Sequence, residues 1–374
     1  MAVGTVALMI LGVQPVLLGA LADAHRITDG ELGPLATVEV LAIAAGSAFG
    51  PAWMRRGNMR LKAIVLSVAL AVANMAIFLV DRGIMLDVLR GFAGLLEGVL
   101  MGATIVVTIE GRHPDRLNAI FLAASTLPQA VMAFFLPIWI VPRFGVNGGF
   151  VVLAVLSLLS AGASLFLVES RTDAPGPPGS GSTPTPRTLW SIPAVLALAA
   201  IGLQNAAIGG AWDYVDRLAS QHHYPPEMSG IAVSGGLVVQ VLGALAAAAW
   251  GRKLSFRWTL IVGTLCQAAV IGWLALAATP LMYVLPALLF GLFWLAMSPF
   301  QVRLLIAIDP SRTVAMLVTA AALVGLSIGP SVSALGVSAG DVTGAFWIAA
   351  AMMLGALCLY AVLALRKMTE TFET

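Results

Sequence analysis

Runs of about 20 apolar residues, each followed by a short polar segment, recur from one end of the chain to the other. A helix needs about this many apolar residues to cross the hydrocarbon core of a lipid bilayer. The pattern therefore predicts an all-α polytopic membrane protein with twelve transmembrane helices. We place these helices at residues 2–22, 33–53, 62–80, 84–109, 117–141, 146–168, 190–212, 229–250, 258–277, 281–305, 313–337 and 342–365.

Residues 169–188 interrupt the pattern between the sixth and seventh predicted helices, because they are rich in proline, glycine and serine. Such a composition has little apolar surface to bury and is typical of a linker. We therefore predict an N-terminal six-helix bundle at 1–168, a cytoplasmic linker at 169–188 and a C-terminal six-helix bundle at 189–374.

The two predicted bundles share a sequence motif. Three positions of the first bundle recur 190 residues later: Gly12, Gln14 and Gly19 as Gly202, Gln204 and Gly209. Two similar halves in one hydrophobic chain are typical of transporters whose substrate site lies between the halves.

The composition supports a membrane location. The chain is 60% hydrophobic and 10% charged, with a mean hydropathy of +0.97, whereas soluble domains carry about 25% charged residues. So few charged side chains cannot cover the surface of the protein, and we expect lipid to face most of it. The net charge of +2 does not indicate a nucleic-acid partner.

The basic residues predict the orientation. Most of them fall on the side that receives both termini and the linker, and the other side receives only Arg26, Arg82, Arg143 and Arg217. Because Lys and Arg accumulate in cytoplasmic loops, we expect both termini to be cytoplasmic. The rarity of lysine and the absence of an N-glycosylation acceptor favour a bacterial inner membrane.

The predicted helices, the central linker and a basic loop after the second helix resemble the major facilitator superfamily over nearly the whole chain. In that family the loop between helices 2 and 3 reads G-x-x-x-D-R-x-G-R-[RK]. This chain keeps Gly50, Arg55 and Gly57, continues to Arg60, and has Met54 in place of the aspartate. The resemblance implies two pseudo-symmetric bundles in the major facilitator fold. It also implies a cytoplasmic gating loop that contains the two glycines and the two arginines but lacks the family's usual carboxylate.

The fourth predicted helix carries most of the charge found inside the spans. Asp87, Arg90 and Glu97 lie three and seven residues apart, which places them on one helical face. Glu97 lies about 20 Å from the outer end, close to the midplane, where a carboxyl group that takes up a proton is what proton coupling requires. The alternative is a simple hydrogen bond to a neighbouring helix.

Arg90 suits an anionic head group, since arginine binds carboxylates through two hydrogen bonds. Its alternatives are an ion pair with Asp87 or Glu97, or an extended side chain that reaches the outer surface. Glu39 in the second helix is a further candidate for proton coupling, although pairing across the two halves is equally expected.

The seventh predicted helix ends in Trp-Asp-Tyr-Val-Asp-Arg at residues 212–217. This segment could form an outer gate or a site where protons enter, and Asp213 is its candidate for proton coupling. We favour the other interpretation, in which Trp212 and Tyr214 belong to an aromatic belt at the lipid headgroups.

Amide side chains within the spans are candidates for substrate binding, because they orient a polar ligand without the cost of a buried ion. In the major facilitator superfamily helices 1, 4, 7 and 10 line the cavity. The resemblance therefore implies that six residues face it: Gln14, Arg90, Glu97, Gln204, Asn205 and Gln301. Gln129 is a weaker candidate of the same kind. The alternative role of these amides is to hold helices together.

The sequence favours a secondary active transporter that moves a small organic solute, with an anionic solute as one candidate, by proton-coupled uptake. The alternative is proton-driven efflux. Uptake is favoured because Ala123-x3-Leu127-Pro128 lacks both glycines of the family's antiporter motif. A membrane sensor or intramembrane enzyme is the alternative of a different class.

No nucleotide-binding loop and no hydrolase motif occurs in the sequence, so we expect no cofactor and no enzyme activity. His222, His223 and Met228 have no second ligand cluster within the spans, so we expect no metal site. The expected partners are a small-molecule substrate, protons and the lipid bilayer, and the protein is expected to be a monomer.

Overall fold

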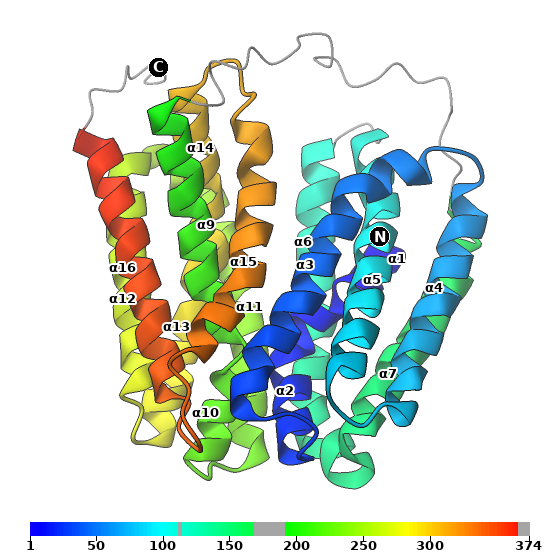
Figure 1. Ribbon diagram of the computed structural model, residues 1–374. Coiled ribbons are helices and arrows are strands. Elements are labelled where there is room, and N and C mark those ends of the chain that lie inside the picture. The colour runs from blue at the N-terminus through cyan, green and yellow to red at the C-terminus, as the bar shows by residue number, and fades with distance from the viewer. Residues whose placement is uncertain (111–113, 168–190, 366–374) are drawn as a thin grey trace.

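The computed structural model describes residues 1–110, 114–167 and 191–365, and nearly all of these residues are helical. The predicted linker at 169–188 lies outside the described residues. Helices that precede residue 168 gather on one side of the molecule, and those that follow residue 190 gather on the other (Figure 1). We call these two groups the N-terminal part and the C-terminal part.

The N-terminal part follows the predicted spans closely. Its elements are α1 (Ala2–Ala7), α2 (Met9–Asp23), α3 (Asp29–Met54), α4 (Met59–Met75), η1 (Ala76–Leu79), α5 (Ile84–Glu110), α6 (Pro114–Phe135), η2 (Leu136–Ile140) and α7 (Val141–Ser164). The first predicted helix is divided at Leu8 into α1 and α2. Thr28 caps α3 by accepting a hydrogen bond from the backbone of Glu31, whose side chain bonds back to the Thr28 backbone.

The C-terminal part also follows the prediction. Its elements are α9 (Ile192–Trp212), α10 (Val215–Gln221), α11 (Pro226–Trp250), η3 (Gly251–Lys253), α12 (Phe256–Ala275), α13 (Pro280–Ala296), α14 (Ser298–Ile308), η4 (Ala315–Leu317), α15 (Val318–Ala334) and α16 (Thr343–Leu365). The tenth predicted helix is divided at Met297, and a proline follows two residues later.

Eleven helical segments among the described residues are long and apolar enough to span a membrane. Two predicted helices are joined in one of them, Ala124–Ser164, which has 41 residues. That length corresponds to about 60 Å of helix, roughly twice the hydrocarbon thickness. Gly145 interrupts it with a positive φ of 65°, and the chain turns back between α6 and α7 (Figure 1).

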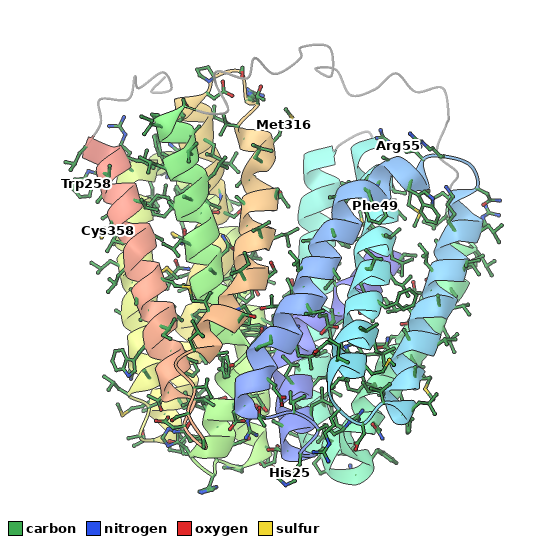
Figure 2. All side chains as sticks on the ribbon, viewed as in Figure 1. His25, Phe49, Arg55, Trp258, Met316 and Cys358 are labelled. Atoms are coloured by element: carbon green, nitrogen blue, oxygen red, sulfur yellow. The ribbon has the colours of Figure 1, made fainter. Side chains whose placement is uncertain are left out.

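We name the two ends of the molecule by the segments that they carry. The linker end holds the last residues of α7 and α16 and the first residues of α9, together with Arg55, which is labelled in Figure 2. The distal end holds the α2–α3 loop with His25 (Figure 2) and the α15–α16 loop.

Glycine residues bring the paired helices of each part into close contact. Gly98 of α5 lies against the backbone of α3 at Ile43, and Gly329 of α15 lies against the backbone of α9 at Ala206. A Cβ atom at either glycine would overlap a backbone oxygen. Small residues that permit close backbone approach are typical of helix packing in membranes.

Several contacts join the two parts toward the distal end. Gly33 of α3 packs on the backbone of Pro330 in α15, and the Thr37 and Ser331 hydroxyls lie 2.7 Å apart. Gly230 of α11 packs against η2 at Pro137. From this contact α3 and α15 diverge toward the linker end (Figure 1).

Candidate functional site

A buried ion pair joins two helices of the N-terminal part. The Arg90 guanidinium of α5 bonds to the Glu39 carboxylate of α3, and each residue is 1% exposed. Gln14 of α2 donates a hydrogen bond from its amide nitrogen to the other Glu39 oxygen at 3.3 Å. Three residues predicted separately from the sequence are therefore brought together at one point.

Arg90 has further partners on two other helices. Its second terminal nitrogen donates to the Asn74 side-chain oxygen of α4 at 3.0 Å, and its guanidinium lies over the Phe150 ring at 5.0 Å. Both terminal nitrogens are thus engaged within the protein. We call the residues Gln14, Glu39, Asn74 and Arg90 the charged network.

The partner of Arg90 differs from the two that the sequence suggested. Asp87 and Glu97 share a helical face with Arg90, but Arg90 pairs with Glu39 of the adjacent helix. The reason is the close approach of α3 and α5, where Gly94 of α5 lies against the backbone of Glu39 itself. This approach also corrects the expectation that Glu39 pairs across the two halves, since its partner belongs to the same part.

Glu97 is the remaining carboxyl group of α5. It is 3% exposed, and within the described residues its Oε2 atom has no hydrogen-bond partner. The charges that act on it are those of Glu39 and Arg90. A buried carboxylate without a partner is costly, so this group is suited to bind a proton.

A second buried network lies in the C-terminal part. Gln204 of α9 donates to the Gln267 side-chain oxygen of α12 at 2.6 Å. Its own side-chain oxygen accepts hydrogen bonds from Gln301 of α14 at 2.9 Å and from the Tyr360 hydroxyl of α16 at 2.8 Å. All four residues are at most 5% exposed. We call them the neutral network.

Two members of the neutral network were predicted from the sequence and two were missed. Gln204 and Gln301 were expected to face a cavity, and in this conformation they bond to each other. Gln267 and Tyr360 were missed, as was Asn74 of the charged network. Each of these three residues appears in the sequence as a single polar residue within an apolar run. That pattern does not show whether the side chain points toward another helix or toward lipid.

The other amide candidates are placed elsewhere. The Asn205 amide nitrogen bonds to the backbone oxygen of Ile201 one turn earlier in α9. The Gln129 side chain of α6 packs against Gly12 of α2, which leaves no room for a Cβ atom at the glycine. Both residues are less than a tenth exposed.

The predicted gating loop lies at the linker end, between α3 and α4. Gly50 packs against the backbone of α5 at Val99, and Gly57 has a positive φ of 80°. Arg60 donates to the backbone oxygen of Leu167 at 3.2 Å. In this conformation the loop therefore contacts other elements of the N-terminal part.

The distal end carries ionic contacts between the two parts. Arg217 of α10 bonds to Asp23 at 2.5 Å and to Asp29 at 2.7 Å, and both carboxylates belong to the N-terminal part. The Tyr214 hydroxyl donates to the backbone oxygen of Asp29 at 3.2 Å, and the Trp212 indole donates to that of Leu11 at 3.0 Å. We call this interface the distal gate.

The aromatic-belt interpretation of this segment is wrong. Trp212 is 4% exposed and Tyr214 is fully buried, so neither ring lies at a lipid surface. Trp212 packs against Phe290 and Trp294 of α13 and bonds to Leu11 of α2, and Tyr214 bonds to Asp29 at the start of α3. The segment therefore belongs to the contact between the parts.

Asp213 lies in the same segment and is 2% exposed. The charge of Glu39 acts on it, although Glu39 belongs to the N-terminal part. A negative charge on Glu39 therefore disfavours a negative charge on Asp213. Within the described residues, no group of three or more His, Cys, Asp and Glu residues is placed to hold a metal ion.

Comparison with known proteins identifies the fold. No protein-family profile and no curated protein sequence matches the chain. Among solved structures, a mutant of the nucleoside transporter NupG aligns with a TM-score of 0.74 at 12% identity, covering 97% of this chain and 98% of that protein. An auto-inhibited POT family peptide transporter aligns with a TM-score of 0.71 at 12% identity, covering 100% and 98% respectively. Both of these proteins are transporters, and this chain shares their fold over nearly its whole length.

Proposed function

We propose that the protein is a secondary active transporter that moves a small organic solute across the membrane by alternating access, coupled to protons. In this proposal twelve helices form two six-helix bundles at 1–168 and 189–374, and the linker end is cytoplasmic. The Ala124–Ser164 segment then crosses the membrane twice, as its length and the break at Gly145 allow. The fold shared with two transporters supports this proposal.

One observation supports the proposal of proton coupling. Two buried carboxyl groups, Glu39 and Glu97, interact with the buried cation Arg90, which already pairs with Glu39, and the charge of Glu39 also acts on a third buried carboxyl group, Asp213. Buried charges are tolerated in a membrane protein when they are paired. The remaining carboxyl groups can be neutralised by protons, and Glu97 is the better candidate because its free oxygen has no hydrogen-bond partner among the described residues.

The geometry also bears on the substrate. Arg90 is 1% exposed and both of its terminal nitrogens are engaged, so an anionic solute could bind it only after the ion pair with Glu39 opens. Uncharged solutes with several hydrogen-bonding groups do not require this step. Nucleosides and peptides, the solutes named for the two structural neighbours, are therefore suitable first probes.

The test is transport into proteoliposomes that contain the purified protein. Labelled nucleosides and dipeptides serve as probes, with and without an imposed pH gradient. We expect inward flux that rises when protons can flow inward. Flux that ignores the gradient contradicts proton coupling, and flux directed against the proton gradient identifies the alternative, efflux.

The residue assignment is tested with Glu97→Gln. This variant should retain exchange of the probe across the membrane but lose the response of net flux to the pH gradient. Asp87→Asn is the matched control, since Asp87 is a half-buried carboxylate on the same helix, and it should behave as the wild type. An unchanged gradient response in Glu97→Gln, with a wild-type thermal unfolding temperature, overturns the assignment.

A further inference from the structure

Asp216 occupies an unusual position in the distal gate. It lies on α10 of the C-terminal part and is 7% exposed. One carboxyl oxygen accepts a hydrogen bond from the Ser229 hydroxyl of α11. The other rests on the backbone of Gly19 in α2 of the N-terminal part, where a Cβ atom would overlap it. The carboxyl group is therefore enclosed between the two parts.

No cation neutralises this carboxyl group within the described residues. Arg217, its neighbour in the chain, forms ion pairs with both Asp23 and Asp29 instead. The charged and titratable groups that act on Asp216 are Asp23 of α2, Arg217 of α10 and Tyr283 of α13. Asp23 repels a negative charge at Asp216, and the tyrosine hydroxyl already donates to the backbone oxygen of Val215.

We propose that Asp216 is a proton-binding residue of the distal gate, which closes when this carboxyl group is protonated and opens when it is ionised. When closed, the gate holds the group between Ser229 and Gly19, away from water. When α2 separates from α10, water can reach the carboxylate and stabilise its charge. Gly19 is required because only a residue without a side chain allows α2 to cover the group.

This proposal rests on alternating access as the proposed function, and it adds a second proton-linked group to Glu97. The direction of the pH dependence follows from the enclosure of the carboxyl group in the closed gate. The closed gate binds one proton more than the open gate, so acid favours the closed state and alkali favours the open state. If the distal end is extracellular, a proton taken up from outside helps to close the gate behind the substrate.

The test measures the opening of the gate without any substrate. Spin labels are placed at Leu79→Cys and Leu335→Cys, two distal positions that are 88% and 81% exposed, in a protein whose Cys266 and Cys358 are replaced by serine. Double electron–electron resonance in nanodiscs then reports the populations of the short and long distances. We expect the open-to-closed ratio of the parent protein to rise with pH, by at most about tenfold per pH unit for one proton.

Three variants test the role of Asp216. Asp216→Asn should hold the gate closed over the whole pH range, because an amide resembles the protonated acid. Asp23→Asn, which removes an exposed partner of Arg217, should favour opening at every pH but keep the pH response. Glu97→Gln should also keep it, so a failure of the proposed coupling site is distinguished from a failure of this inference.

A glycine variant tests the enclosure independently. Gly19→Ala should open the gate even at acidic pH. Gly162→Ala is the matched control, since Gly162 is a helical glycine with open space where the added methyl group would lie, and it should behave as the parent protein. If the open-to-closed ratio of Asp216→Asn depends on pH as it does in the parent protein, the proposal is overturned. A parent protein whose distal distance does not respond to pH overturns it as well.

Discussion

The two buried networks start from the same repeated residue and differ in charge. Gln14 of the N-terminal part bonds to a carboxylate that is paired with a guanidinium. Gln204, 190 residues later, bonds to two further amides and a tyrosine hydroxyl. Each network joins four helices of its own part, but only the first contains charged side chains, those of Glu39 and Arg90.

The difference teaches how one repeated position can serve two purposes. A neutral network holds helices together at any pH, because its members keep their protonation states. A charged network can change its interactions when a proton or a charged ligand arrives. We therefore place the proposed coupling in the N-terminal part and assign the neutral network a scaffold role.

The largest expected effect comes from breaking the ion pair. Arg90→Met leaves Glu39 buried without its cation, which should cost about 3–5 kcal/mol of stability. The thermal unfolding temperature in detergent measures this loss. The loss should shrink at acidic pH, where Glu39 can bind a proton and lose its charge.

A second substitution separates charge from packing at this site. Arg90→Met combined with Glu39→Gln should recover much of the stability, because no uncompensated charge remains. A double variant that is as unstable as Arg90→Met alone would show that Arg90 acts mainly through its contacts with Asn74 and Phe150.

The corresponding break in the neutral network should have a smaller effect. Gln204→Leu removes three hydrogen bonds, after which the Tyr360 hydroxyl keeps its interaction with Gln301 and the Gln267 oxygen is left buried without a partner. We expect a loss of about 1–3 kcal/mol for an orphaned group of this kind. The unfolding temperature should fall equally at acidic and neutral pH, and a strong pH dependence would contradict the scaffold role.

The smallest expected effect comes from a single hydroxyl group. Tyr360→Phe removes one of the two hydrogen bonds accepted by Gln204 and leaves the ring in place. The expected loss is about 0.5–1.5 kcal/mol. Transport measured in proteoliposomes should be unchanged, and a loss of transport at wild-type stability would bring the neutral network into the substrate path.

Much of the fold could be predicted from the sequence, because an apolar run long enough to span a bilayer indicates a helix that crosses the membrane. The predicted helix at 33–53 corresponds to Asp29–Met54, and that at 342–365 to Thr343–Leu365. The junction of α6 and α7 was less predictable, since the chain stays helical up to Gly145 and turns only there.

The candidate site was predicted in part. The polar side chains of Gln14, Glu39 and Arg90 stand out in apolar runs, and this made them candidates. The pairing of Arg90 was not predicted, because the spacing along one helix suggests neighbours on that helix alone. The burial of Trp212 was also missed, since an aromatic residue at a helix end has the same sequence signal at a lipid boundary and at an interface between two parts.

The sequence by itself determined the membrane environment, the positions of the helices and the repeated glutamines, because hydropathy and repetition are properties of the chain. The tertiary structure alone decided which polar groups meet. Partners on different helices depend on rotation, tilt and close approach, as where Gly94 brings Glu39 to Arg90 and where Gly19 covers Asp216. A side chain of a few ångströms reaches its partner only when the backbones pack closely, and that packing is a property of the whole fold.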